Sequence, residues 1–283
     1  MGVRETDAEL RRLIEASESV RGAPISRLGY FCAPFRPVDG PFSDSVVKVY
    51  RSRADDAALD RLAEAHSAYV IALRECGIRL PDTELHLVQS QGRRVPVIVQ
   101  AALPADSLMR PHMERADLET ALALMESAGE VIATFATGVV GRPERIGFHP
   151  SIRNLAVLDG QGIFFDTFPP LIGYSRDEMG QLLITYSGSP LMRAVGPLLR
   201  ARVTGIQDEW YSPADMLVGL VGSACRLRPA EADAFLAWGR DFSARRMQPH
   251  VDEIHRHLDT PPQLPGYWTA ARRLLGLQGK PNI

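Results

Sequence analysis

The sequence predicts an α+β fold with two lobes, a small lobe that mixes strands with helices and a larger lobe that is mainly helical. In the first hundred residues, short apolar runs rich in β-branched side chains are typical of strands. Farther along, apolar residues recur at helical spacing and are interrupted by turns that contain Pro or Gly. The change falls near Leu103 to Arg110. We therefore expect lobes at residues 1–103 and 104–283, joined by a short hinge.

The small lobe is expected to contain two helices and four strands. The long helix ends where Gly77 follows it, and the last two strands flank the turn sequence Ser90-Gln91-Gly92. In chain order the expected elements are the helix Glu5 to Ser19, the strands Leu28 to Cys32 and Val46 to Tyr50, the long helix Ala54 to Glu75, and the strands Glu84 to Gln89 and Val95 to Ala102.

The large lobe begins with a strongly helical stretch from Asp117 to Ala136. A short hairpin is expected between Asn154 and Asp166, because Asp159-Gly160 is a preferred hairpin turn. Later in the lobe, the helix dipeptides Arg245-Arg246 and Arg272-Arg273 are expected to supply salt-bridge partners, either on the surface or between the lobes. From Ser175 onward the pattern is mostly helical, with breaks at Gly188-Ser189-Pro190, Ser212-Pro213, Arg228-Pro229 and Pro261-Pro262.

Bulk composition argues against several kinds of partner. The chain has 283 residues, 45% of them hydrophobic, which is enough for a sizeable core, and a formal net charge of −2. Such a charge gives no strong field for nucleic acid or an anionic membrane, and no apolar run is long enough to span a bilayer. Three widely spaced cysteines and an N-terminal region without a signal-type apolar core favour a cytoplasmic protein. We expect neither nucleic acid nor a membrane as a partner.

Lysine is rare in this chain, whereas arginine is common, and lysine occurs only at Lys48 and Lys280. Lys48 lies inside the expected strand Val46 to Tyr50. A compact ammonium on a flexible stem serves a different purpose from a planar guanidinium. Lys48 is therefore either a strand-end lysine whose ammonium reaches water or a point charge placed for an anionic ligand.

Four polar positions have the spacing that phosphoryl transfer would need. Lys48 could pair with Glu64 on the long helix and present its ammonium to nucleotide phosphates. Closing the Asp159-Gly160 turn brings the amide of Asn154 close to the carboxylate of Asp166. Two such oxygen ligands beside phosphate oxygens make a Mg²⁺ site, and metal and lysine together would neutralise charge on a transferred phosphoryl group. Asn154 and Asp166 could instead be simple turn or cap residues.

This order of strand lysine, helix glutamate, apolar hinge, His-x-x-x-x-Asn loop, hairpin and Asp resembles the protein-kinase-like fold. It is most similar to the branch of aminoglycoside and small-molecule phosphotransferases. The resemblance covers roughly residues 25–260 and rests on order and spacing. It implies a two-lobed fold with a small antiparallel sheet in the N-lobe, a mainly helical C-lobe and a catalytic-type loop at 147–170. It also implies ATP or another nucleoside triphosphate, Mg²⁺, and a small-molecule substrate.

The resemblance assigns a role to each of these positions. Lys48 corresponds to the phosphate-binding strand lysine, and Glu64 corresponds to its helix partner. Gln100 to Leu103 correspond to the hinge that binds adenine. Asn154 and Asp166 correspond to the two metal ligands.

The chain departs from the family pattern at His149, which stands where the family carries its catalytic Asp, five residues before Asn154. A neutral imidazole can act as a general base, and it can equally fix the loop through a backbone carbonyl. No Gly-x-Gly-x-x-Gly lies between the first two expected strands. Thr167-Phe168-Pro169-Pro170 follows Asp166 in place of the usual Phe-Gly.

Three functions remain open at this point. The first is an ATP- and Mg²⁺-dependent phosphotransferase that acts on a small-molecule hydroxyl. The second is an altered member of the same fold, either a pseudokinase that scaffolds a protein partner or a biosynthetic enzyme that reuses the cleft, and the missing Asp and Gly-rich loop are what it predicts. The third is a helical binding protein of unrelated fold. The wall that selects a ligand is expected after Pro170, from Tyr174, Tyr186, Trp210 and Tyr211.

Overall fold

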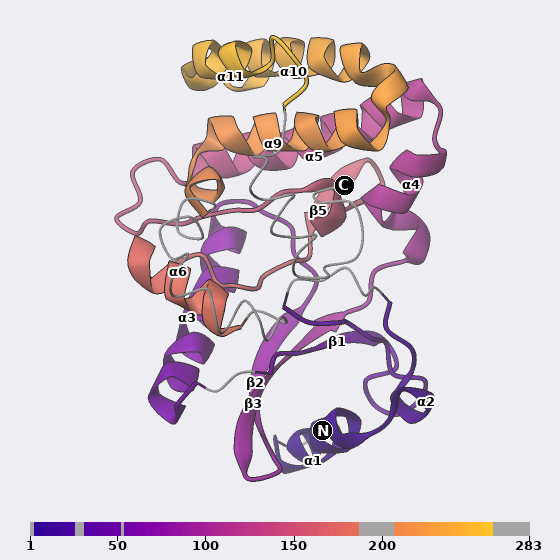
Figure 1. Cartoon of the computed structure of the whole chain (residues 1–283), viewed down its shortest axis with the longest axis vertical. Coiled ribbons are helices and arrows are strands. Elements are labelled where there is room, and N and C mark those ends of the chain that lie inside the picture. Colours follow the sequence, from indigo (N-terminus) through magenta and orange to yellow (C-terminus); the bar gives the residue numbers. More distant parts are fainter. Residues whose placement is uncertain (1–2, 26–30, 52–53, 187–206, 263–283) are drawn as a thin grey trace.

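A computed structural model describes residues 3–25, 31–51, 54–186 and 207–262. It has the expected α+β composition, with a small antiparallel sheet and many helices (Figure 1). No helix in these ranges is both long and apolar enough to cross a membrane. The elements of the first half are α1 (Val3–Glu15), α2 (Glu18–Arg21), β1 (Ser45–Val49), α3 (Asp56–Glu75), β2 (Thr83–Ser90), β3 (Arg93–Ala101), α4 (Met109–Arg115) and α5 (Leu118–Gly138).

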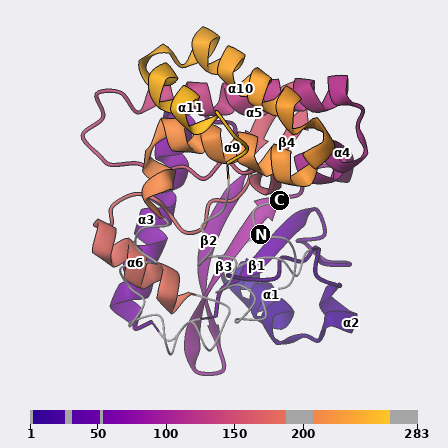
Figure 2. The same cartoon turned by 45° about the horizontal axis from the view of Figure 1, so that its top comes forward.

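The second half contains one hairpin and a set of helices that lie together beyond the sheet (Figures 1 and 2). Its strands and α-helices are β4 (Leu155–Leu158), β5 (Gln161–Phe164), α6 (Arg176–Thr185), α9 (Pro213–Leu227), α10 (Ala232–Arg246) and α11 (Val251–His257). Short 3-10 turns cover Ala105–Ser107, Ile152–Asn154, Gln207–Tyr211, Pro229–Glu231 and Gln248–His250.

The three-stranded sheet has the order β1-β3-β2, and both of its strand pairs are antiparallel. The turn between β2 and β3 is the expected one, because Gln91 and Gly92 both have positive φ angles, 51° and 74°. Two positive φ angles in succession are typical of the hairpin turn that matches the twist of the strands. The expected strand Leu28 to Cys32 lies mostly outside the described residues, and Phe31 and Cys32 belong to no strand.

The two faces of the sheet are covered by different helices. Val47, Val88 and Val97 pack with Leu10 and other apolar residues of α1 in a small core of their own. Side chains alternate along a strand, so the neighbours of these valines point to the opposite face. On that face Ile98 joins the main core, together with the buried residues of α3. The predicted helix Glu5 to Ser19 is interrupted, since α1 ends at Glu15 and α2 begins at Glu18.

The helix α3 follows the prediction closely. The side chain of Asp55 accepts a hydrogen bond from the backbone N–H of Ala58 and caps the first turn. The helix ends before Gly77, whose φ of 84° suits a residue without a Cβ. Its buried residues belong to a hydrophobic core that continues without interruption into α5, α9, α10 and α11. The sheet and the helices therefore share one main core.

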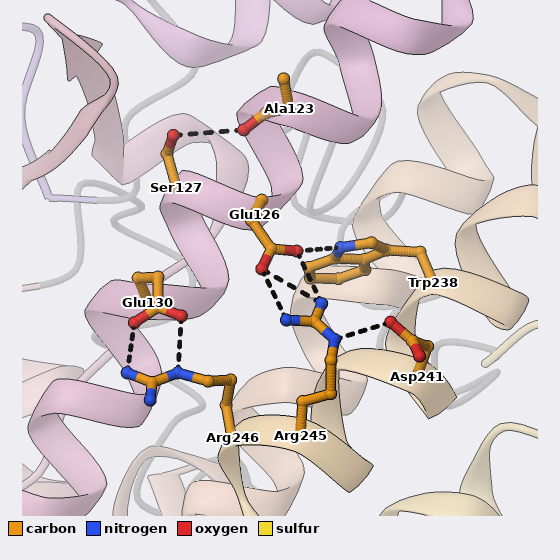
Figure 3. Close-up of polar contacts among 8 residues, drawn as sticks. All are labelled: Ala123, Glu126, Ser127, Glu130, Trp238, Asp241, Arg245 and Arg246. Carbon is orange, nitrogen blue, oxygen red and sulfur yellow. Dashed lines mark hydrogen bonds and ion pairs between the residues drawn. The ribbon is translucent and has the colours of Figure 1, made fainter.

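Ion pairs link side chains of α10 to side chains of α5 on the surface of the helices (Figure 3). Arg246 donates two hydrogen bonds to Glu130, at 2.7 and 2.6 Å, while Arg245 binds Glu126 and Asp241. The expectation that Arg245-Arg246 supplies surface salt bridges is confirmed, and Arg272-Arg273 lies outside the described residues. These side chains are half-exposed, so each pair adds little stability and mainly fixes the helix orientation.

A glycine permits the close approach of α10 to α5. A Cβ built on Gly129 of α5 would lie 2.8 Å from the ring of Phe242 on α10, whose side chain is fully buried. We expect Gly129→Ala to lower the free energy of unfolding by about 1–3 kcal/mol, because the ring cannot move without displacing the core. Urea denaturation monitored by circular dichroism measures the change.

Gly219 of α9 gives the matched control, since a Cβ at this exposed helical position meets no atom within 4 Å. Gly219→Ala should stabilise the protein by up to about 1 kcal/mol, through helix propensity alone. Equal effects of the two substitutions would contradict the close packing of α5 and α10.

Candidate functional site

The alternation of β1 points Lys48 away from α1. Val47 packs against α1, so Lys48 shares the opposite face with Ile98, its partner on β3. The side chain is 7% exposed, and its ammonium donates a 2.8 Å hydrogen bond to the carbonyl oxygen of Phe165. An ammonium carries three protons, and the other two find no partner among the described residues. The ammonium also lies 5.9 Å from the centroid of the Phe165 ring. A buried cation with one hydrogen bond and one ring contact is well placed to bind an anion.

Asn154 and Asp166 lie at the open end of the hairpin formed by β4 and β5. Asp159 and Gly160 form its turn, with φ angles of 53° and 72°. Beyond the ladder, the Phe165 N–H donates to the carbonyl oxygen of Asn154 at 3.1 Å, which holds the two chain segments together past Leu155 and Phe164. The predicted hairpin and its turn are confirmed.

The side-chain oxygens at this end of the hairpin are not used by the described part of the protein. The amide nitrogen of Asn154 donates to the backbone oxygen of His149 at 3.1 Å, which leaves the amide oxygen free. The carboxylate of Asp166 is partly buried and accepts no hydrogen bond from a described residue. Burial raises the pKa of the Cys32 thiol to about 11. The charge of Lys48 lowers this pKa and the charge of Asp166 raises it, so both groups act on the same thiol. Lys48 and Asp166 therefore lie in one neighbourhood.

The described residues contain no cluster of three or more His, Cys, Asp or Glu side chains that could hold a metal by themselves. The amide oxygen of Asn154 and the carboxylate of Asp166 would suit Mg²⁺, which takes few protein ligands and completes its shell with phosphate and water. Their unused oxygens fit that requirement.

The predicted ion pair between Lys48 and Glu64 is wrong. Glu64 is exposed on α3, whereas the Lys48 ammonium is buried, and no ion pair between them occurs in the described structure. The physical reason lies in the helical period. Glu64 is two residues from both Leu62 and His66, which are buried, and a step of two residues turns its side chain to the opposite side of the helix.

His66 occupies the place on α3 that Glu64 was expected to fill. Its ring is 2% exposed, and its Nε2 lies 3.0 Å from the hydroxyl of Thr167, a residue with no exposed surface. Burial, and to a lesser extent the charge of Lys48, lowers the pKa of His66 to about 4. The helix thus faces the lysine with a neutral imidazole and holds the residue next to Asp166.

Phe168 anchors the segment after Asp166 in the core. Its ring stacks on Tyr50 at 3.8 Å between centroids and meets Tyr186 and Phe31 edge-on. Together with the contact between His66 and Thr167, this packing fixes the backbone on which the Phe165 carbonyl and the Asp166 carboxylate are placed.

The hinge residues have two different environments. The Gln100 side chain is 3% exposed and donates to the hydroxyl of Thr83 at 2.9 Å, so it links β3 to β2 and is not open to a ligand. Leu103 is partly buried, and its backbone N–H has no partner within the described ranges. Any adenine contact of the hinge would therefore rest on Leu103.

His149 is held in place by its loop. Its ring stacks on Trp210 at 5.0 Å, and the backbone N–H of Phe148 donates to the carbonyl oxygen of Trp210. Its Nδ1 lies 3.5 Å from the amide nitrogen of Asn154. Burial lowers the pKa of His149 to about 4, although the Asp166 carboxylate acts in the opposite direction. His149 is consequently neutral at pH 7 and a weak base.

Sequence reasoning missed His66 and Thr167. Leu59, Leu62, His66, Tyr69 and Leu73 are buried at spacings of three and four, and this stripe was a readable signal for His66. Thr167 gave no local signal, because its partner lies 101 residues away.

A model described as "Family of unknown function (DUF6206)" matches residues 9–279. No curated protein matches the chain.

After burial, the charge of Lys48 is the second cause of the lowered pKa of His66. Lys48→Met removes the charge and keeps most of the stem, so the pKa of His66 should rise from about 4 but stay below 6.5, because the ring remains buried. A pH titration of the imidazole signals by NMR measures this shift. Arg93→Met, which removes an exposed charge at the far end of β3, should leave the pKa of His66 unchanged. If the pKa of His66 is the same in Lys48→Met as in the wild type, the charge of Lys48 does not act on His66.

Proposed function

The chain belongs to DUF6206, a family of unknown function, and from its site we propose that it is a kinase-like phosphotransferase. It would move a phosphoryl group from ATP or another nucleoside triphosphate to the hydroxyl of a small molecule, with Mg²⁺. The observation that carries the proposal is the buried Lys48 ammonium, with two protons that no described residue accepts, near the oxygens of Asn154 and Asp166, which accept no hydrogen bond from a described side chain. A polyphosphate bound to Mg²⁺ matches both halves of this site.

The arrangement of the first half supports the kinase-like part of the proposal. The Lys48 strand β1 lies beside β3, and β3 leads directly into the hinge at Gln100 to Leu103. The helix α3 stands between β1 and β2 in sequence and covers the Lys48 face of the sheet. In protein kinases, a strand lysine, the helix that follows it and a metal-binding Asp assemble around the nucleotide. The chain departs from the kinase pattern at two positions. His66 faces Lys48 where kinases have an acid, and His149 stands where they have the catalytic Asp.

The proposed reaction forms a bond between the γ-phosphorus and the acceptor oxygen. It breaks the bond between the γ-phosphorus and the oxygen that bridges to the β-phosphate, and the hydroxyl proton passes to His149 or to water. Lys48 would bind phosphate oxygens and offset their growing charge. Mg²⁺, held by Asn154 and Asp166, would supply further charge neutralisation. Because the transition state of such transfers is loose, positioning matters more than a strong base.

His149 favours a second candidate, an altered member of the fold that binds nucleotide and transfers slowly or not at all. A general base is most effective with a pKa near the working pH, and the pKa of His149 is about 4. Its ring is also stacked on Trp210. A pseudokinase would act through a protein partner. Nucleotide binding without turnover would distinguish this candidate from the phosphotransferase.

The binding half of the proposal is tested by calorimetric titration of ATP with and without Mg²⁺. We expect Mg²⁺-dependent binding to the wild-type protein. Lys48→Met should weaken it about tenfold or more, because a charged hydrogen bond to phosphate contributes roughly 1.5–3 kcal/mol. Asp166→Asn should abolish the Mg²⁺ dependence and leave the fold intact, since the Asp166 carboxylate accepts no hydrogen bond from the residues that the structure describes.

Asp159→Asn is the matched control for that titration. It removes a carboxylate from the same hairpin, at a turn position with φ of 53° that Asn also tolerates. It should bind Mg²⁺ and ATP like the wild type. Absence of Mg²⁺-dependent binding in the wild type, or an Asp166→Asn variant that keeps it, would refute the proposal.

The role of His149 is tested by initial rates of transfer. If it accepts the proton, His149→Ala and His149→Asn should lower turnover more than nucleotide affinity. Its neutral form is the base, and that form is lost only as the pH falls through about 4, so wild-type turnover should stay level from pH 7 to pH 5 with respect to this group. Equal turnover in the variants and the wild type would remove His149 as the base.

A further inference from the structure

A pocket of about 540 Å³ lies beside the loop that carries His149. His149 and Trp210 form part of its wall, and the rest comes mainly from α9 and from the chain around the end of α11. Lys48 and Asp166 are not among the residues that line it. Trp210 belongs to the aromatic wall that the sequence predicted for selecting a ligand. The volume of the pocket lies in the range of small-molecule sites, and its wall combines apolar surface with polar groups, as such sites do.

The charged side chains that line the pocket cancel one another. Two of them are acidic, Glu209 and Asp215, and two are basic, Arg226 and Arg256. The two signs are also mixed in space. Burial raises the pKa of Glu209, the charge of Asp215 raises it further, and the charge of Arg226 lowers it, so Glu209 lies near a group of each sign. A charged ligand would be attracted by some of these groups and repelled by others while it lost its own hydration, so the pocket does not favour an ion of either sign.

Hydrogen-bond acceptors and donors without a partner among the described residues line the same space. The acceptors are the carboxylates of Glu209 and Asp215, since Asp215 contributes only its backbone N–H to the cap of α9. On the donor side, Arg256 uses its Nε for a backbone carbonyl oxygen of α11, at 3.2 Å, which leaves its two terminal nitrogens. The Ser151 hydroxyl makes no capping bond, and the indole N–H of Trp210 adds a further donor. A ligand that fills this pocket therefore has to supply both donors and acceptors.

We propose that this pocket binds a neutral polyol, a ring-shaped molecule such as a sugar or a cyclitol. Each hydroxyl has one donor and two acceptor sites, so it can donate to a carboxylate and accept from a guanidinium or from the indole N–H. A neutral ligand without hydroxyls would displace water from these groups and leave them unpaired, which costs free energy. The C–H face of the ring would pack on the apolar atoms of Trp210 and Met216, which also line the pocket.

His149 relates this pocket to the proposed reaction. It lines the pocket, and its Nδ1 lies 3.5 Å from the amide nitrogen of Asn154, one of the two proposed metal ligands. A polyol in the pocket would therefore place a hydroxyl beside the group expected to receive the acceptor proton, and that hydroxyl would be the phosphoryl acceptor. This assignment of the acceptor rests on the proposed function. The binding of a polyol does not, because it can be measured without nucleotide.

The test is calorimetry at pH 6.5 with two sets of rings of matched size. Myo-inositol and cyclohexanol differ in their number of hydroxyls. D-glucose, D-glucosamine and D-glucuronate differ in charge, because the amine is protonated and the carboxylate is ionised at this pH. We expect inositol or glucose to bind at least about tenfold more tightly than cyclohexanol, since one charge-assisted hydrogen bond changes affinity by about this factor. Neither glucosamine nor glucuronate should bind more tightly than glucose.

Substitutions separate hydrogen bonding from charge. Glu209→Ala and Asp215→Ala should each weaken polyol binding about tenfold, whereas Glu209→Gln should weaken it less, because the amide keeps an oxygen acceptor. Glu209→Gln also leaves the pocket with a net positive charge, so the affinity for glucuronate should rise relative to that for glucose. Glu119→Ala is the control, because Glu119 is exposed on α5 and does not line the pocket. It should bind like the wild type, and unchanged thermal unfolding would show that the pocket variants fold.

Tryptophan fluorescence locates the binding. A bound polyol should change the emission of the wild type and of Trp238→Phe, but not that of Trp210→Phe, because Trp210 lines the pocket and Trp238 does not. The inference is overturned if neither neutral polyol binds, if cyclohexanol binds as tightly, or if a charged sugar binds more tightly than glucose. It is also overturned if both Ala variants bind like the wild type or if Trp210→Phe keeps the emission change. Since no nucleotide is present, such a failure is separate from a failure to bind ATP with Mg²⁺.

Discussion

The hydrogen bond from the Lys48 ammonium to the carbonyl oxygen of Phe165 joins positions 117 residues apart in the chain. It joins β1, an edge strand of the three-stranded sheet, to the end of the β4–β5 hairpin, and the other contacts of the site are arranged around it. His66 is neutral beside this charge and reaches past it to Thr167, and Phe168 enters the core one residue later. A buried cation is costly unless it is paired and hydrogen-bonded. The Phe165 carbonyl supplies one such hydrogen bond to Lys48.

Charges are handled differently outside this site. On the surface, arginines meet carboxylates directly, as Arg245 and Arg246 do with Glu126 and Glu130. In the site, Lys48 meets a neutral carbonyl, while the carboxylate of Asp166 and the amide oxygen of Asn154 have no protein partner in the described ranges. Groups left unsatisfied in this way are candidates for contact with a ligand.

Much of the fold could be predicted wherever the signal was local. The turns at Gln91-Gly92 and Asp159-Gly160 place two hairpins, because few residues accept their backbone angles. The helix α3 was readable from its apolar period and from Gly77 at its end. The break between α1 and α2 was not predicted, since helical periodicity continues through it.

The site was only partly predictable, for a physical reason. The strand pattern predicted the position of Lys48 in β1, and the hairpin turn predicted that Asn154 and Asp166 lie at the same end of the hairpin, because short-range geometry fixes both. Finding His66 would have required knowing which face of α3 packs toward Lys48, whereas the resemblance assigned Glu64 by its place in the sequence. Contacts between distant segments, such as that of His66 with Thr167, depend on how α3 packs against the loop after β5, and no local pattern encodes them.

The division of the apolar side chains into two cores has a consequence for local opening. The small core between α1 and the sheet, which includes Leu10 and Val88, is separate from the main core that runs from α3 into α9 and α10. Amide protons of α1 can therefore exchange with solvent through an opening that releases only that small core. Those of α3 are protected by the main core and should exchange only when the sheet and the helices open together. Slow-exchanging amides would thus map the main core across both halves of the chain.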